Sequence, residues 1–253
     1  MKIKNARLAL GACAMIGLLA GCAGGGASNG GVTGAVPQVR SVAMRAPEAL
    51  PQARILARLG RGLPAHSSSG RSWMDPSAVT SDLLYVSDTD TSEVYVFSYP
   101  QGKPKGALTG FTDPAGVCVD AHGNVFVTNT GGFNVLEYAH GGTTPIATLK
   151  DAGYFPVGCS VDPKTGNLAV TNFATSSSTQ GNVVIYKGAK GRPTGFYTNP
   201  NMSEMLLCGY DASGNLFVDG TTASSAAKFA ELPSGKTKLV LLTLNQSIAS
   251  PGG

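Results

Sequence analysis

Oxygen-bearing side chains follow four similar apolar segments of this 253-residue sequence. They are Asp88, Asn129, Asn172 and, one residue earlier within its own segment, Asp219. Carboxylate and amide oxygens are the ligands that Ca²⁺ and Mg²⁺ prefer, so these residues would suit a cation site if the fold brought them together. Asp and Asn side chains also commonly bond backbone groups at strand ends. The spacing alone leaves both interpretations open.

Other patterns of chemistry find less support in the sequence. The three histidines, His66, His122 and His140, share no metal-ligand spacing. Residues 79–253 contain no G-x-S-x-G segment, so this part of the sequence does not indicate a nucleophile elbow. Residues 79–253 carry ten Lys and Arg against thirteen Asp and Glu, which argues against nucleic-acid binding. We therefore expect no catalytic set, no nucleic-acid partner and no cofactor beyond such a divalent cation.

The cysteines suggest one covalent link. They are Cys13, Cys22, Cys118, Cys159 and Cys208, and none forms a C-x-x-C pair. Cys159 and Cys208 occupy the same position in two neighbouring repeats, whereas Cys118 is one residue out of phase. An exported protein can form disulfides, so the sequence allows a Cys159–Cys208 bridge. The alternative is that these thiols pack as small apolar side chains.

Residues 1–22 have the three parts of an export signal. Basic residues come first and an uncharged apolar run follows over residues 8–19. The segment then ends in Leu19-Ala20-Gly21-Cys22, which resembles the lipobox of bacterial lipoproteins. That resemblance implies lipid attachment at Cys22, and Ala23 in the next position implies the outer membrane. We expect a protein that is anchored in the cell envelope through this lipid.

Residues 23–78 are expected to form a disordered tether. Glycines dominate its beginning, and six arginines with only Glu48 and Asp75 as acidic residues follow. Residues 47–59 could form a short basic helix that contacts anionic lipid or peptidoglycan. The simpler interpretation is a solvated linker.

A repeat over residues 79–253 determines the expected fold. One skeleton occurs at residues 84–88, 125–129, 168–172 and 216–220. The central valines of these segments, Val86, Val127, Val170 and Val218, are 41, 43 and 48 residues apart. A period of this length with several short strands in each unit is typical of β-propeller blades.

The units also share an internal order. A short apolar strand that ends in Asp precedes the valine segment, at residues 116–120, 158–162 and 207–211. A turn containing Gly and Asn joins the two, in which Asp can bond the backbone and Gly can supply a positive φ. A third strand and a weaker fourth strand follow. We therefore predict an all-β propeller with four-stranded blades, of which about four are present.

This skeleton is similar to the NHL and SMP-30/gluconolactonase repeat, most clearly at Asp113-Pro114-Ala115-Gly116-Val117-Cys118-Val119-Asp120. The resemblance implies that Asp88, Asn129, Asn172 and Asp219 converge on one mouth of the ring. SMP-30 lactonases hold a divalent ion there with Glu, Asp and Asn, but no Glu occupies the corresponding position in the first unit.

Two functions follow from this resemblance. The first is a binding module without catalysis that takes a protein, a glycan or a small ligand at the mouth. The second is a truncated, metal-dependent lactonase-like hydrolase. Related rings usually have six blades, so we expect either a chain cut short after Ser250-Pro251-Gly252-Gly253 or a partner that completes the ring.

Overall fold

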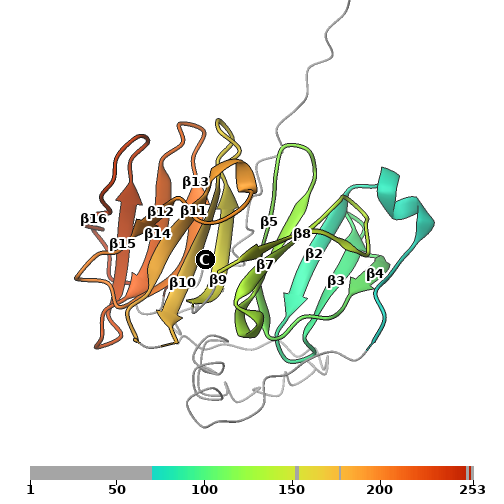
Figure 1. The fold of residues 1–253 in the computed structure, drawn as a ribbon, viewed down its shortest axis with the longest axis horizontal. Helices are drawn as coiled ribbons and strands as arrows, with labels where there is room; N and C mark the ends of the chain where they lie inside the picture. The colour runs from blue at the N-terminus through green and yellow to red at the C-terminus, as the bar shows by residue number, and fades with distance from the viewer. Residues whose placement is uncertain (1–69, 152–153, 177, 249–250, 252–253) are drawn as a thin grey trace, which may run out of the picture. The chain divides into compact units, whose positions relative to one another are not determined.

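The computed structural model describes residues 70–151, 154–176, 178–248 and 251. In this part the chain forms four antiparallel sheets of four strands each (Figure 1). Each sheet is built from one continuous stretch of sequence. The all-β fold and the four repeat units expected from the sequence are confirmed.

The strands follow the predicted repeat. The first sheet has the order β1-β4-β3-β2, with β1 at Trp73–Met74, β2 at Leu83–Asp88, β3 at Glu93–Ser98 and β4 at Pro104–Leu108. The second consists of β5 (Pro114–Val119), β6 (Val125–Asn129), β7 (Asn134–Tyr138) and β8 (Pro145–Lys150). The third consists of β9 (Tyr154–Val161), β10 (Leu168–Thr175), β11 (Asn182–Tyr186) and β12 (Gly195–Tyr197). The fourth consists of β13 (Glu204–Tyr210), β14 (Leu216–Thr221), β15 (Ala227–Leu232) and β16 (Val240–Leu242).

Helical structure in the described residues is limited to three short 3₁₀ turns. They are η1 (Pro76–Thr80), η2 (Thr130–Gly132) and η3 (Lys187–Ala189). No helix in the described ranges has the length and apolar character needed to cross a bilayer. Cys22 and the rest of the expected export signal lie outside the described residues.

The hairpins between the first two strands of the second, third and fourth sheets form as the sequence predicts. The Asp120 carboxylate accepts the backbone N–H of His122 at 2.8 Å and of Asn124 at 2.9 Å. Asp211 accepts two backbone N–H groups in the same way in the fourth sheet. Gly123 in the first of these turns has φ of +87°, a conformation that glycine adopts without strain.

The first sheet differs from the others and corrects the tether prediction. Residues 23–78 were expected to be disordered, but Trp73–Met74 forms β1 and pairs with Ala107 and Gly106 of β4. Asp75 then caps η1, because its carboxylate accepts the Ser77 N–H at 2.8 Å. These partners come from β4, about 30 residues further on, so local composition does not reveal them. The folded part therefore begins before residue 79.

The sheets stack face to face in sequence order, and each has two distinct faces. We call the face toward the following sheet the forward face and the opposite one the backward face. Side chains alternate between the two faces along a strand. Tyr85 of β2 therefore packs forward against Val125 and Val127 of the second sheet. Phe126 likewise packs forward against Leu168 and Val170 of the third sheet.

The third and fourth sheets meet in the same manner. Ala169 shares a buried cluster with Leu216 and Val218 of the fourth sheet. We call the strands that carry the central valines of the repeat, β2, β6, β10 and β14, the valine strands. At all three joints between sheets, one forward side chain of a valine strand thus meets two backward side chains of the next. The repeat seen in the sequence is therefore a repeat of packing contacts.

The first strands of the later repeats approach each other closely. β5 lies beside β9, and β9 lies beside β13. A Cβ atom on Gly116 would lie 2.6 Å from the Val157 carbonyl oxygen, and one on Gly158 would lie 2.7 Å from the Leu206 carbonyl oxygen. The glycine of each Pro-x-Gly segment is therefore needed where two backbones meet. The four described sheets do not form a closed ring.

Candidate functional site

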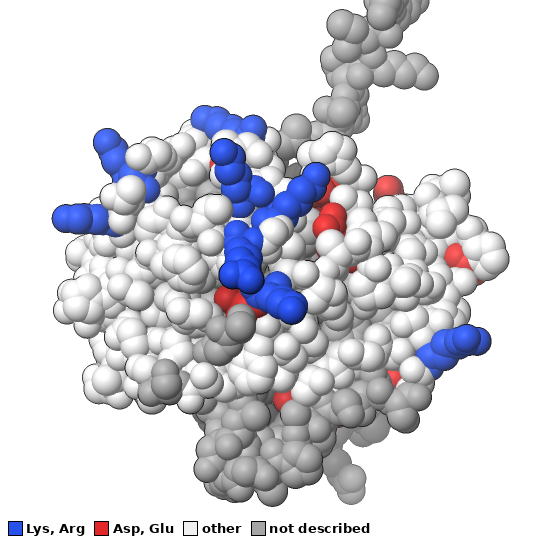
Figure 2. Space-filling view, viewed as in Figure 1, with Lys and Arg blue, Asp and Glu red and all other residues white. Residues whose placement is uncertain are grey.

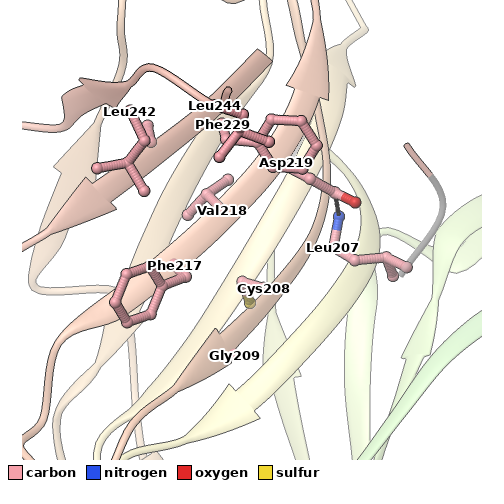
Figure 3. Close-up of a pocket in the computed structure, with 10 residues that line it drawn as sticks. Leu207, Cys208, Gly209, Phe217, Val218, Asp219, Phe229, Leu242 and Leu244 are labelled. Carbon is pink, nitrogen blue, oxygen red and sulfur yellow. Dashed lines mark hydrogen bonds between the residues drawn. The ribbon is translucent and has the colours of Figure 1, made fainter. Parts of the chain in front are cut away.

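The forward face of the fourth sheet carries an apolar hollow (Figure 3). Its volume is about 370 Å³, and five large apolar side chains line it, from Leu207, Phe217, Phe229, Leu242 and Leu244. They come from β13, β14, β15, β16 and the segment after β16. Hollows of this size and character typically take apolar groups of a ligand or partner.

The exposure of Phe217 is unusual for its place in the repeat. Phe217 occupies the same position as Phe126 and Ala169, which are fully buried at joints between sheets. Phe217 is 40% exposed. The hollow is therefore the forward half of a joint for which no other half lies among the described residues.

The backward face of the first sheet shows the complementary exposure. Leu84 and Val86 are 46% and 42% exposed, whereas the corresponding residues in the other three sheets are at most 2% exposed. Tyr95 and Phe97 stand opposite them on β3 and extend this face. The described chain thus presents two unpaired apolar faces, one forward and one backward.

Asp219 is the acidic residue in the hollow, and the fold already uses it. The register between β13 and β14 shifts between Met205 and Cys208, so the N–H of Leu207 lacks a regular ladder partner. Asp219 Oδ1 accepts that N–H at 2.6 Å. Thr128 does the same in the second sheet, where its hydroxyl accepts the Gly116 N–H at 2.6 Å. Asp219 therefore has a structural role that the repeat assigns to this position.

Asp88 and Asn129 also bond the backbone near their own strands. Asp88 Oδ1 accepts the N–H groups of Asp90 at 2.9 Å and Thr91 at 3.2 Å. Asn129 Oδ1 accepts the Thr112 N–H at 2.6 Å. These contacts match the strand-end role that was the alternative to a cation site. No three His, Cys, Asp or Glu side chains of the described residues gather as a metal site would require. The cation site remains a prediction.

Asn172 takes part in a buried polar cluster that sequence reasoning missed. Its amide donates to Asn182 Oδ1 at 2.9 Å, while its own Oδ1 is buried and has no hydrogen-bonding partner among the described residues. Both carboxylate oxygens of Asp151 are likewise buried, and no described residue meets them in hydrogen-bonding geometry. Burial raises the pKa of Asp151 to about 6, and the nearby Asn172 side chain offsets part of that shift. A protonated Asp151 would suit these acceptors, because a carboxylic acid can donate a hydrogen bond.

The disulfide prediction is wrong in its partner. Cys159 is bonded to Cys118, with Cα atoms 5.8 Å apart, and Cys208 is free. Cys159 and Cys208 occupy equivalent positions, so both point backward from their sheets and cannot meet. Cys118 is one residue out of phase and points forward, directly at Cys159. The one-residue difference in phase made Cys118 seem an unsuitable partner. It places the Cys118 side chain on the forward face, and this position permits the bond.

Charged side chains are sparse over much of the folded part. Figure 2 shows Lys and Arg gathered on the upper part of one face, with mostly uncharged surface around them. Exposed Lys187, Lys190 and Arg192 belong to the η3 turn and the residues after it. The hollow itself is lined almost entirely by uncharged groups.

Comparison with known proteins supports the fold alone. No family model and no curated protein matches the chain. Hydrazine synthase from Kuenenia stuttgartiensis is similar in structure, with a TM-score of 0.55 and 15% identity over 79% of this chain and 52% of that chain. U3-55K has a TM-score of 0.49 and 14% identity over 67% of this chain and 53% of its own.

The chain spans about half the length of these solved chains. The first likeness, together with the four stacked sheets, identifies the folded part as propeller-like. At this identity it says nothing of activity. The narrower resemblance to NHL and SMP-30 repeats remains a prediction.

Proposed function

We propose that this protein is an envelope-anchored binding module, which a lipid on Cys22 holds at a membrane and which binds a protein partner through the hollow on its fourth sheet. The observation that carries the proposal is the exposure of Phe217, whereas the equivalent Phe126 and Ala169 are fully buried. Contiguous apolar surface on a folded domain commonly marks an interaction site.

The composition of the hollow favours a macromolecular partner. Phe217 and Phe229 supply aromatic rings, and Leu242 and Leu244 add aliphatic groups, with Leu244 beside Phe229 (Figure 3). Aromatic side chains with apolar neighbours typically provide much of the binding energy at protein interfaces. The hollow lies on an open sheet face, and such a face suits another folded surface.

The contacts of the candidate cation ligands fit a binding module better than a metal-dependent enzyme. Asp88, Asn129 and Asp219, which were candidates for a cation site, all accept hydrogen bonds from backbone N–H groups. A side chain that closes a strand end in this way has fewer oxygen lone pairs left for an ion. These contacts favour the binding module over the lactonase-like hydrolase.

The proposal of a lipid anchor at Cys22 is based on the amino-acid sequence alone. The basic front, the apolar run and Cys22 after small residues together form the lipoprotein pattern. One acyl chain binds a bilayer only reversibly, so lasting attachment would need two or more chains. Cys22→Ser should move the protein from the membrane fraction to the soluble fraction, and full retention in the membrane fraction would contradict the anchor.

The binding surface can be tested by crosslinking in cells that export the full chain. A photoreactive phenylalanine analogue at position 217 should give a discrete crosslinked product. The same analogue at Ile146, which is 56% exposed on β8, should give none. Adding Phe229→Lys to the first chain should remove the product, since it places a charge in the hollow. Equal crosslinking from both positions, or none from 217, would contradict the proposed surface.

A further inference from the structure

We propose that the partner at the hollow is a second copy of this chain, joined head to tail so that the fourth sheet of each copy packs on the first sheet of the other. This inference rests on the proposed function, because it names the occupant of the same surface. It requires that the forward face of the fourth sheet and the backward face of the first sheet fit together as neighbouring sheets do within the chain.

The three joints within the chain define what such a half looks like. At each one, a forward residue of one valine strand packs in the same apolar cluster as two backward residues of the next. Phe126 meets Leu168 and Val170 at the joint between the second and third sheets. Phe217 holds the forward position on the fourth sheet. Leu84 and Val86 hold the two backward positions on the first sheet.

The exposures agree with this assignment. Leu84 and Val86 are 46% and 42% exposed, and Phe217 is 40% exposed, although the equivalent residues at internal joints, apart from Tyr85, are at most 2% exposed. The forward residue of the first sheet, Tyr85, is half-buried against the second sheet. At these positions of the four strands, exposure of 40% or more is therefore found only on the faces that have no neighbour in the described chain.

The two faces also match in chemistry. The backward face of the first sheet presents Tyr95 and Phe97 beside its two aliphatic residues. The forward face of the fourth presents Phe217, Phe229 and Leu242. Aromatic and aliphatic groups on both sides allow the dense packing seen at the internal joints.

Symmetry makes a pair of copies a closed arrangement. A forward face on one copy and a backward face on the other form one joint. A two-fold axis forms the second, identical joint if the four sheets of each copy turn through half a circle, and the inference requires this turn. Two copies supply eight sheets, which lies within the range of about four to eight blades known for propellers. Among the described sheets, no unpaired forward or backward face would remain.

The first test is the mass of the full chain carrying Cys22→Ser, so that no lipid contributes to association. Sedimentation of the purified protein should show one species of twice the chain mass. Phe217→Lys and Val86→Lys should each weaken the dimer by at least about tenfold, as expected for residues at the centre of an interface. Ile146→Lys, at an exposed position on an outer strand, should leave it unchanged. A monomer, or a ladder of larger species, would overturn the inference.

The second test fixes the direction of the joint. Chains with Phe217→Cys are mixed with chains carrying either Leu84→Cys or Val86→Cys and then oxidised gently. A disulfide-linked dimer should form in the mixture and not from any of the variants alone. A dimer from Phe217→Cys alone would indicate a symmetric contact and overturn the head-to-tail joint.

These outcomes separate the inference from the proposed function. A monomeric purified chain, combined with a product at position 217 in cells that has a mass other than two chains, would leave a binding module with a different partner. A monomeric chain without any product at position 217 would remove both.

Discussion

Cys118 on β5 and Cys159 on β9 face each other across the joint between the second and third sheets, with their Cα atoms 5.8 Å apart. One side chain points forward and the other backward, as a bond between two stacked sheets requires. The same relationship recurs one joint further along. Ser160 stands where Cys118 stands in its sheet, and Cys208 stands where Cys159 stands.

Ser160→Cys should therefore form a second disulfide, with Cys208. The Ser160 hydroxyl already accepts the backbone N–H of Tyr210 at 3.0 Å, so this side chain points at β13. A new cross-link of this kind typically stabilises a domain by about 2–4 kcal/mol. Peptide mapping without reduction should find the new bond, and urea unfolding should show the gain.

Val161→Cys is the matched control for this bond. Val161 is the neighbouring residue on β9 and packs in the opposite direction, against the second sheet. It should leave Cys208 free. A bond from position 161 and none from position 160 would show that the faces have been assigned the wrong way round.

Because β5 and β9 approach each other closely, we expect that adding one methyl group at Gly116 will strongly destabilise the fold. Gly116→Ala would place Cβ 2.6 Å from the Val157 carbonyl oxygen and 2.9 Å from the Gly158 Cα atom. Overpacking against backbone should cost about 1–3 kcal/mol in the free energy of unfolding. Urea unfolding of the full chain measures this cost.

Gly209 provides the comparison on another first strand. A Cβ atom there would meet nothing within 4 Å, so Gly209→Ala should be neutral or slightly stabilising. If both substitutions had the same effect, the close approach of β5 to β9 would be wrong.

Because Asp151 is buried, we expect the free energy of unfolding to fall as the pH rises. Burial raises its pKa in the folded chain from 3.8 to about 6, so the folded state holds the proton more tightly than the unfolded state. The contribution is fully present below about pH 4 and is lost as the pH rises through about 6. At about 1.4 kcal/mol for each pKa unit, the loss is on the order of 3 kcal/mol.

Asp151→Asn should remove this pH dependence and stabilise the protein at neutral pH. Unfolding by urea at several pH values between about 4 and 7 would show the change. Asp211→Asn serves as a contrast, because backbone hydrogen bonds lower the pKa of Asp211 and its contribution is lost as the pH falls. An unchanged pH profile for Asp151→Asn would contradict the buried acid.

Much of the fold could be read from the repeat, because its valine strands and Asp-Gly-Asn turns depend on local spacing. β6 and β10 begin where their apolar segments do, and Asp120 closes its turn as expected. The two-residue β1 has no repeat signal, since its partner is on β4.

The candidate site depended on contacts that local spacing does not contain. The apolar character of Phe217 is evident in the sequence, but its exposure depends on which sheet follows it in space. Asp151 is distant from Asn172 in the sequence, and only the packing of the third sheet places the two side chains beside each other. The phase of Cys118 did carry information, because an odd offset between strands means opposite faces.

Stacking in one direction is the claim on which the hollow, the two unpaired faces and the head-to-tail joint all depend. Peptide mapping of the full chain, isolated without reduction, tests it most directly. The structure predicts a Cys118–Cys159 linked peptide and a free thiol at Cys208. A Cys159–Cys208 linked peptide would mean that equivalent positions face each other, and it would contradict the stacking.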